Sequence, residues 1–349
     1  MNKKNIRNLL IIIFLLIVII STASLIFGYN LMYKSNFQTP NNKKCLFFIR
    51  ENDNFADILD SLSAKGYLKN REKVENYAKI RNLEGRLKVG CYAIKSGMTN
   101  RDFFNAVCNG WQTPIQLKFN NIRFNSQLAS KISKQVNIDS VDMANLLNDK
   151  EFLAKYCFTP QTVIAMFIPN TYEVYWTISA EQLFERMEKE YKKFWNAERL
   201  EKAAKIPLTP IEVAVLASIV EEESNKKHEK PIIAGLYINR LKKGMKLQAC
   251  PTARYAAGDF SITQVLDIHT SIDSPYNTYK NFGLPPGPIR MPSIEGIDAV
   301  LNYAKHNYIF MCAKPELNGE NNFSVTLAEH DRNTEAYYKA YREWKKKNK

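Results

Sequence analysis

The chain has 349 residues, of which 45% are hydrophobic and 12% aromatic, so it can bury a sizeable core and has room for two domains. Its formal net charge is +14, but the lysines and arginines are spread along the chain, which argues against a nucleic-acid partner and favours an anionic polymer or a membrane surface. The six cysteines have no metal-ligand spacing, so we expect no zinc site, while buried thiols and disulfides both stay open.

The N-terminus combines a basic tail, residues 1–8, with an apolar run, residues 9–33 (LLIIIFLLIVIISTASLIFGYNLMY), that is long enough to cross a bilayer. Because Lys3, Lys4 and Arg7 precede the run, we expect a single-pass helix in the cytoplasmic (inner) membrane, with a cytoplasmic N-terminus and the body of the protein outside. A cleaved signal peptide is the alternative. It is disfavoured because the run exceeds a usual signal-peptide core and no clear Ala-x-Ala site follows.

A polar linker is predicted at 34–44, followed by a small domain of short strands and helices at 45–112. Hydrophobic periodicity and capping residues place its elements. They are a strand at 45–49, a helix within 54–66 stopped by Gly66, a helix at 71–82, a strand at 90–95, and a helix within 98–110 with Thr99 and Asp102 as its capping box and Gly110 as its stop.

A larger domain is predicted from residue 113 to residue 349, with longer helices and few strands. Its final third is expected to be loop-rich, and the stretch 274–293 carries five prolines. The other predicted elements are a strand at 115–119, a helix at 125–136, two short helices within 142–157, a turn at 166–176, a helix capped by Ser179 and Gln182 that runs to Trp195, a helix from Thr209, and a helix in the first half of 232–248 broken by Gly244.

The segment LTPIEVAVLASIVEEES, 208–224, predicts a core helix that ends in three glutamates. Thr209, Pro210 and Glu212 form a helix start. The ten residues from Ile211 have no polar stripe of ordinary width, so the helix should be surrounded by protein. The glutamates therefore fall at the helix C-terminus.

A carboxylate at that end is disfavoured by the helix dipole and by its charged neighbours, so at least one should have a raised pKa. Glu223 is the candidate, because it lies over Val220, Ile219 and Leu216, which are three, four and seven residues back. A protonated carboxyl of this kind can donate a proton at neutral pH. A solvated acidic helix end is the alternative interpretation.

One further group of residues is a candidate. Tyr276, Asn277, Thr278 and Tyr279 are sugar-binding residue types within the proline-rich loop, although a surface turn with packed tyrosines would look the same. Among the four histidines none lies in an HExxH motif or beside a GxSxG serine, and no GxxxxGK or GxGxxG occurs, so no metal, nucleotide or other cofactor is predicted.

Four segments in order carry a resemblance: ASIVEEES, YINRLKKGMKLQACPTARYA, YNTYKNFGLPPGPI and FSVTLAEHDRN, spanning 217–333. They resemble the MltG (YceG-like) family of membrane-anchored endolytic murein transglycosylases. Upstream, LKVGCYAIKSGMTNRDFFNAVCNG resembles the LysM-like domain of that family. The resemblance implies an α+β protein with an N-terminal transmembrane helix, a small LysM-like α/β domain at 45–112 and a larger α+β catalytic domain at 113–349.

The resemblance also implies a lyase reaction. It is cleavage of nascent peptidoglycan between N-acetylmuramic acid and N-acetylglucosamine, without water and with 1,6-anhydro ends, and it would terminate strand elongation. Glu223 matches the family's catalytic acid and Glu221 a supporting glutamate, whereas Glu222 is given no role. One carboxyl suffices because it first protonates the glycosidic oxygen and then accepts the proton of the attacking C6 hydroxyl.

Further residues are implied as the lining of the glycan groove, with peptidoglycan strands as the substrate and membrane peptidoglycan synthases as partners. The sequence departs from the family at two positions, Cys250 and Asn170, where an aspartate is frequent. The substrate contacts made at these two positions therefore stay open. The implied groove residues are Asn239, Gln248, Thr252, Tyr276, Asn277, Thr278 and Tyr279, with Thr326, Glu329 and His330 on the far wall.

Two rival functions stay open at this point. A muramidase that uses water would need a second carboxylate, such as Asp267 or Asp273, facing Glu223 across the width of a water molecule. A non-catalytic peptidoglycan-binding scaffold would need no carboxyl chemistry, so replacing Glu223 would leave glycan lengths unchanged.

Overall fold

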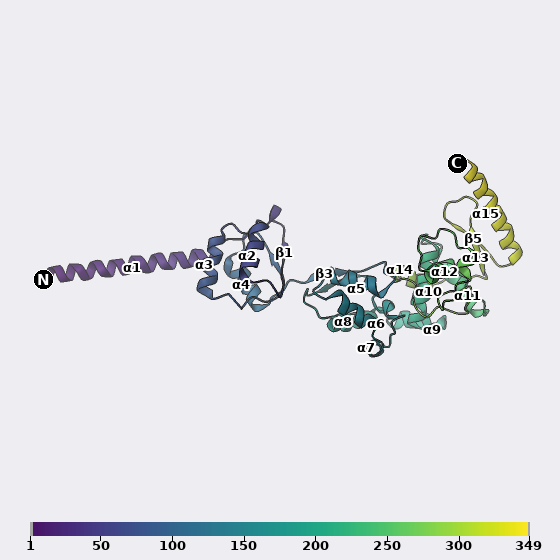
Figure 1. The fold of residues 1–349 in the computed structure, drawn as a ribbon, viewed down its shortest axis with the longest axis horizontal. Helices are drawn as coiled ribbons and strands as arrows, with labels where there is room; N and C mark the ends of the chain where they lie inside the picture. Colours follow the sequence, from purple (N-terminus) through teal and green to yellow (C-terminus); the bar gives the residue numbers. More distant parts are fainter. Residues whose placement is uncertain (1–2, 348–349) are drawn as a thin grey trace. The chain divides into compact units, whose positions relative to one another are not determined.

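The computed structural model describes residues 3–347 as a mixed α+β fold, in agreement with the predicted class (Figure 1). The chain divides into two compact units. The smaller unit holds the chain up to Gln116 together with Glu173–Thr177, and the larger unit holds Leu117–Tyr172 and the chain from Ile178 onward.

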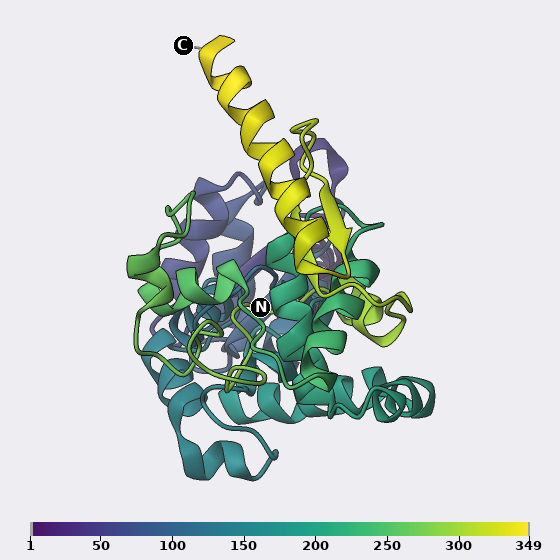
Figure 2. The same cartoon turned by 90° about the vertical axis from the view of Figure 1, so that its right-hand side faces the viewer.

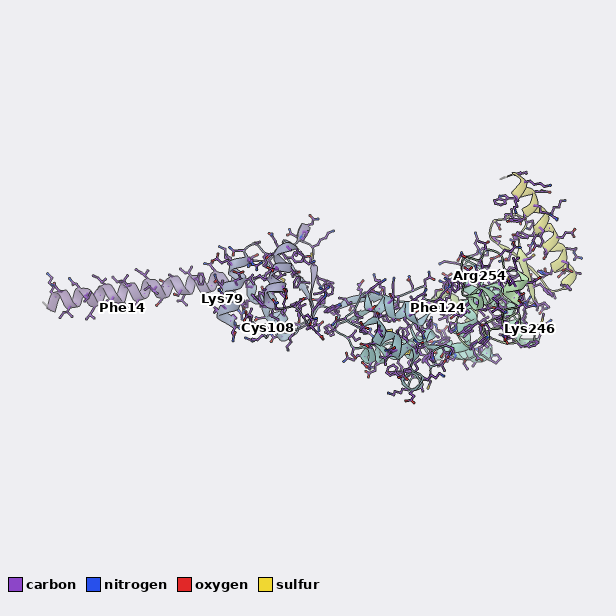
Figure 3. The ribbon with its side chains drawn as sticks, in the orientation of Figure 1. Phe14, Lys79, Cys108, Phe124, Lys246 and Arg254 are labelled. Carbon is purple, nitrogen blue, oxygen red and sulfur yellow. The ribbon has the colours of Figure 1, made fainter. Side chains whose placement is uncertain are left out.

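The first helix, α1 (Lys3–Tyr33), contains the predicted apolar run, and its length and hydropathy are sufficient to cross a membrane. Its apolar side chains from Leu9 to Ile20 are exposed, among them Phe14 (Figure 3). The last turns differ, because Leu31 is buried in the small unit and its carbonyl accepts a 3.0 Å hydrogen bond from Asn100 Nδ2. The helix is therefore packed at its C-terminal end.

The small unit follows the predicted order of elements. Two antiparallel strands pair Phe47 with Tyr92, and the helices cover them with a core of aromatic and aliphatic side chains. The predicted capping box of Thr99 and Asp102 is present, and Gly110 closes its helix with φ 71°. The elements are β1 (Cys45–Ile49), α2 (Phe55–Ala64), α3 (Arg71–Arg81), β2 (Gly90–Ile94) and α4 (Asn100–Asn109).

The polar segment 34–44, predicted as a linker, is instead folded into the small unit. Phe37 is 0% exposed, and its ring centroid lies 4.7 Å from that of Phe103. Asn36 is buried beside it and donates to Asn100 Oδ1 at 2.9 Å. The polar composition misled the prediction because one aromatic ring and one fully bonded amide are enough to anchor a short segment.

The larger unit contains the remaining predicted helices and several that were not predicted. The strands β3 (Ile115–Lys118) and β4 (Thr171–Val174) pair with each other, so the stretch 166–176 includes a strand rather than only a turn. The other elements as far as residue 242 are α5 (Asn125–Ser133), α6 (Ser140–Asn148), α7 (Lys150–Ala154), η2 (Val163–Met166), α8 (Ala180–Phe194), α9 (Ala197–Lys205), α10 (Pro210–Glu223) and α11 (Lys230–Lys242).

The part of the chain expected to be loop-rich is more structured than predicted, although 274–293 forms no helix or strand. The last helix packs along the β5–β6 hairpin (Figure 2). These elements were missed because none except the last is longer than a few turns, which leaves little periodicity to detect. They are α12 (Cys250–Ala257), α13 (Asp267–Thr270), α14 (Ile294–Leu301), β5 (Phe310–Ala313), β6 (Asn321–Ser324) and α15 (Leu327–Lys347).

The core of the larger unit is built around α10, which is buried on every side from Val213 to Val220, as its sequence predicts. The helices α11 and α14 pack directly against it. On α11, Gly235 is required because a Cβ at this position would collide with the carbonyl of Ala304. This close packing fixes the position of the C-terminal end of α10 beside α11.

Candidate active site

Glu223 is the last residue of α10, and it meets a tyrosine from the neighbouring helix. Tyr237, on α11, donates a hydrogen bond from Oη to Glu223 Oε1 at 2.6 Å. The tyrosine is 1% exposed, whereas Glu223 is only partly buried and keeps an exposed edge. A rigid core donor thus holds a carboxyl that a ligand can still reach.

Burial raises the pKa of Glu223 to about 7, and the neighbouring charge of Glu222 adds to the rise. The hydrogen bond from Tyr237 and the positive charges of Arg254 and Arg240 act in the opposite direction, but burial is the larger effect. A carboxyl with a pKa near 7 is present in both protonation states at neutral pH. It can therefore donate a proton and later accept one.

Glu222, to which the sequence assigned no role, is the centre of an arginine cluster. Its Oε1 accepts hydrogen bonds from Arg123 Nη2 at 2.7 Å and from Arg290 Nη1 at 2.6 Å, and Arg254 Nη2 lies 3.8 Å from its Oε2. The three arginines come from separate parts of the larger unit. Glu222 therefore ties the loop before α5, the proline-rich loop and α12 to the end of α10.

Glu221 turns to a third partner, the N-terminus of α14. Its Oε2 accepts a 2.8 Å hydrogen bond from the backbone N–H of Ser293, the residue whose hydroxyl caps α14. A carboxylate in this position is stabilised by the dipole of the helix that follows. The three glutamates thus face three different surroundings, and burial is the main influence on the pKa of Glu223.

The proline-rich loop 274–293 is pinned to the core at several points. Ser218, buried within α10, accepts a 3.0 Å hydrogen bond at Oγ from the N–H of Ile289. The N–H of Met291 donates to the carbonyl of Ile122 at 2.6 Å. Gly287 admits no side chain, because a Cβ there would collide with the carbonyl of Gln161. The loop is therefore a fixed wall beside the glutamates.

Five of the predicted groove residues hold the backbone of this region. The hydroxyls of Thr252 and Thr278 lie 2.7 Å apart and are buried, and Asn277 Nδ2 donates to the carbonyls of Thr270 and Ile272. The backbone N–H of Gln248 donates to the carbonyl of Thr278. Asn239 Nδ2 donates to the carbonyls of His306 and Tyr308. The side chains of Asn239, Thr252, Asn277 and Thr278 are thereby committed within the protein.

Three of the predicted groove residues remain available at the surface: Gln248, whose side chain is exposed, and the two tyrosines, Tyr276 and Tyr279. Tyr279 Oη lies 3.1 Å from the sulfur of Cys250. Burial raises the pKa of both groups, and the charge of Glu223 adds to the rise. The ring centroid of Tyr276 lies 4.7 Å from that of Tyr255, and both rings line a pocket. Neither tyrosine is fully buried.

Thr326, Glu329 and His330 lie together at the start of α15. The carboxylate of Glu329 accepts hydrogen bonds from the N–H groups of Val325 and Thr326, which lower its pKa. The ring of His330 stacks on Phe310 of β5, with the centroids 5.1 Å apart. Within the described chain their contacts are with the β5–β6 hairpin and α15 rather than with Glu223.

The two carboxylates suggested for a water-using mechanism are both exposed. Asp267 opens α13, and Asp273 is almost fully exposed and pairs with Lys280 at 3.6 Å. Glu222, whose charge helps to raise the pKa of Glu223, is itself bound by arginines.

Sequence reasoning missed Tyr237 and the three arginines. The arginine partners had an available signal, because three adjacent glutamates at a buried helix end need cations. Tyr237 had none, since a tyrosine on an apolar helix is ordinarily a core residue and its partner depends on how α10 and α11 pack.

Comparison with known proteins shows what the chain as a whole is similar to. The model of the YceG-like family matches residues 47–336. An endolytic murein transglycosylase of Streptococcus pneumoniae (strain D39) is 28% identical over 361 aligned positions, covering 93% of this chain and 64% of the relative. One of Bacillus subtilis (strain 168) is 46% identical over 122 positions, covering 35% of this chain and 33% of the relative.

Among solved structures, a crystal structure of a YceG-like protein from Listeria monocytogenes matches with a TM-score of 0.53 and 28% identity. The match covers 83% of this chain and 99% of the other. The chain thus spans less than two thirds of the length of the pneumococcal relative, while it accounts for nearly all of the solved structure.

Proposed function

Because the chain belongs to the YceG-like family, we propose that it is an endolytic murein transglycosylase. It cleaves the bond between N-acetylmuramic acid and N-acetylglucosamine in nascent peptidoglycan strands and leaves 1,6-anhydro ends, which terminates strand elongation. The observation that carries the proposal is the carboxyl of Glu223, buried enough to have a pKa of about 7 and held by Tyr237 at 2.6 Å.

The proposed mechanism uses Glu223 twice. The protonated carboxyl donates to the glycosidic oxygen as the bond to C1 breaks, and the carboxylate then accepts the proton of the C6 hydroxyl as that oxygen closes onto C1. The attacking hydroxyl belongs to the same sugar, so no second carboxylate is needed to activate water. Tyr237 holds the carboxyl in place during both steps, and it stabilises the carboxylate that forms after the first proton transfer.

Water attack is the less supported alternative, because the neighbouring carboxylate of Glu222 is engaged by arginines rather than free to act as a base. Glu221 is proposed to act indirectly, by fixing the end of the proline-rich loop through Ser293. Of the predicted groove residues, Tyr276 and Tyr279 are proposed to contact sugar rings. Asn239, Gln248, Thr252, Asn277 and Thr278 hold the groove, and Thr326, Glu329 and His330 form its far wall.

The membrane arrangement is part of the proposal. The helix α1 would cross the cytoplasmic membrane once, with the N-terminus inside and both folded units on the outer side. New glycan strands are made on that side, and membrane peptidoglycan synthases are the partners expected there.

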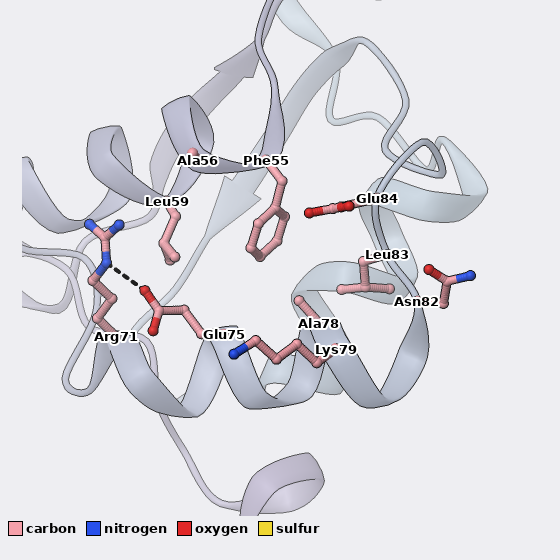
Figure 4. A pocket seen from close by; sticks show the side chains of 10 residues that line it. All are labelled: Phe55, Ala56, Leu59, Arg71, Glu75, Ala78, Lys79, Asn82, Leu83 and Glu84. Carbon is pink, nitrogen blue, oxygen red and sulfur yellow. Dashed lines mark hydrogen bonds and ion pairs between the residues drawn. The ribbon is translucent and has the colours of Figure 1, made fainter.

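The small unit is proposed to be a LysM-like module that binds the same strands. Its strand, helix, helix, strand order from β1 to β2 forms one antiparallel sheet. A cavity of about 420 Å³ lies between α2 and α3, lined by Phe55 and Leu59 and bordered by Lys79 and by Arg71, which pairs with Glu75 (Figure 4). An apolar floor with a rim that carries charges of both signs suits a sugar chain.

The test is mass spectrometry of glycans after purified nascent peptidoglycan is incubated with the protein or with Glu223→Gln. Products that end in 1,6-anhydro-N-acetylmuramic acid, lost in the variant, are expected. Reducing ends would show attack by water instead. Cleavage by neither protein, while both still bind strands, would support the scaffold role.

A further inference from the structure

A second cavity in the larger unit, of about 430 Å³, has no role in the mechanism above. Its size is that of pockets that hold a small ligand or one part of a larger one. Segments that are far apart in the sequence form it. Its lining includes Arg123, Phe124, Tyr255 and Tyr276.

Two residues in the wall of the cavity are linked to Glu223, each through a pair of residues that are neighbours in the sequence. Arg123, in its wall, binds Glu222, which directly precedes Glu223. Tyr255, also in the wall, directly follows Arg254, whose charge acts on Glu223. A ligand that occupies the cavity can therefore be part of the molecule on which Glu223 acts.

The arginine cluster beside the cavity carries a net positive charge. One carboxylate, Glu222, is shared by Arg123, Arg254 and Arg290, so the cluster keeps an excess of positive charge. The side chains of these arginines remain 19–28% exposed. The described residues that line the cavity include no Asp or Glu, so its wall offers Arg123 no further counter-charge.

Aromatic rings line the same cavity. The ring centroid of Tyr255 lies 5.6 Å from that of Phe124 and 4.7 Å from that of Tyr276. The guanidinium of Arg123 lies over the face of Phe260, at 4.4 Å. An arginine and tyrosines that border one cavity suit a ligand that joins a sugar or peptide surface to a carboxylate.

We propose that this cavity binds the acidic peptide stem of the muramyl residue beside the cleaved bond, with Arg123 on a stem carboxylate. The proposal rests on the proposed function, since it names the part of that substrate that the site recognises. It makes the protein selective for strands that still carry their peptides over stripped glycan.

The test compares cleavage of peptide-bearing strands with cleavage of the same strands freed of peptides by an amidase, using the full chain in detergent. The expected preference is about tenfold or more in kcat/KM, carried by KM, because a charge-assisted hydrogen bond is lost with the peptide. Arg123→Gln should abolish the preference and Arg123→Lys should restore part of it. Arg290→Gln is the matched control, because Arg290 binds the same carboxylate but does not line the cavity.

An equal rate on both substrates, or an Arg123→Gln variant that loses both equally, would overturn the proposal. Calorimetry with a soluble muramyl peptide that has free carboxylates provides an arm independent of catalysis. Binding that weakens about tenfold in Arg123→Gln supports the pocket even if no bond is cut. Inorganic pyrophosphate that binds more tightly than this peptide would instead assign the cavity to the diphosphate of a lipid-linked strand.

Discussion

Tyr237 donates a 2.6 Å hydrogen bond from the interior of the protein to Glu223, the partly buried carboxyl at the end of a buried helix. The donor cannot move without disturbing the packing of α11 against α10. The acid is thus oriented by the core and not by a surface loop, and several expectations follow from that arrangement.

Removing the hydroxyl of Tyr237 should change the pH dependence of cleavage. The hydrogen bond favours the ionised carboxyl, so Tyr237→Phe raises the pKa of Glu223 further. The alkaline limb of the kcat/KM profile should move upward accordingly, while kcat falls about tenfold because the carboxyl is no longer held. Tyr279→Phe is the control, since its hydroxyl contacts Cys250 rather than the carboxyl. An unmoved limb in Tyr237→Phe would contradict this role.

The raised pKa of Glu223 also predicts how stability depends on pH. Because the folded pKa is about 7 and the ordinary value 4.5, the folded state binds more protons than the unfolded state between these values. The free energy of unfolding should therefore fall as the pH rises from 4.5 to 7, by up to about 3 kcal/mol, and then level off. Glu223→Gln should lack this decline. Urea unfolding of both proteins across that range measures it, and parallel curves would refute it.

Glu222 should matter more for stability than its place in an acidic triplet suggests. Glu222→Gln leaves the guanidiniums of Arg123 and Arg290 without their shared carboxylate and should cost about 3 kcal/mol. Combining it with Arg290→Gln should recover part of that cost, which a double-mutant cycle by urea unfolding detects. Glu201→Gln is the exposed control, with an expected change under about 1 kcal/mol. Equal losses in the free energy of unfolding of Glu222→Gln and Glu201→Gln would contradict a stabilising role for the arginine cluster.

The segment 34–44 should behave as part of the small unit. Phe37→Ala removes a fully buried ring and should lower the free energy of unfolding of that unit by about 3 to 5 kcal/mol. It should also open the segment to proteases. Lys34→Ala, at an exposed position, should do neither. Rapid proteolysis of 34–44 in the unchanged protein would show a flexible linker after all.

The sequence predicted most of the helices because capping boxes and apolar periodicity are local signals. Thr99 with Asp102, Ser179 with Gln182 and Thr209 with Glu212 all cap the helices expected. It also predicted the raised pKa of Glu223 from the apolar face beneath it. These properties depend on residues within one or two turns, so the chain alone contains them.

The partners of the glutamates could not be predicted in the same way. Whether Tyr237 meets Glu223, and which arginine meets Glu222, depends on the packing of α11, α12 and the proline-rich loop around α10. The same holds for Asn277 and Thr278, whose polar side chains are typical of sugar binding but are used to hold backbone groups. Residue type limits the chemistry available, and tertiary contacts decide how it is used.

The way α1 ends limits where the protein can work. Under the proposed topology, Leu31 and the well-packed segment after it leave no slack between the bilayer and the first folded unit. A protein on a long flexible tether samples a volume of the surrounding wall, whereas the small unit of this chain would stay within a thin layer at the membrane surface. Under that topology, the small unit would search for glycan in two dimensions.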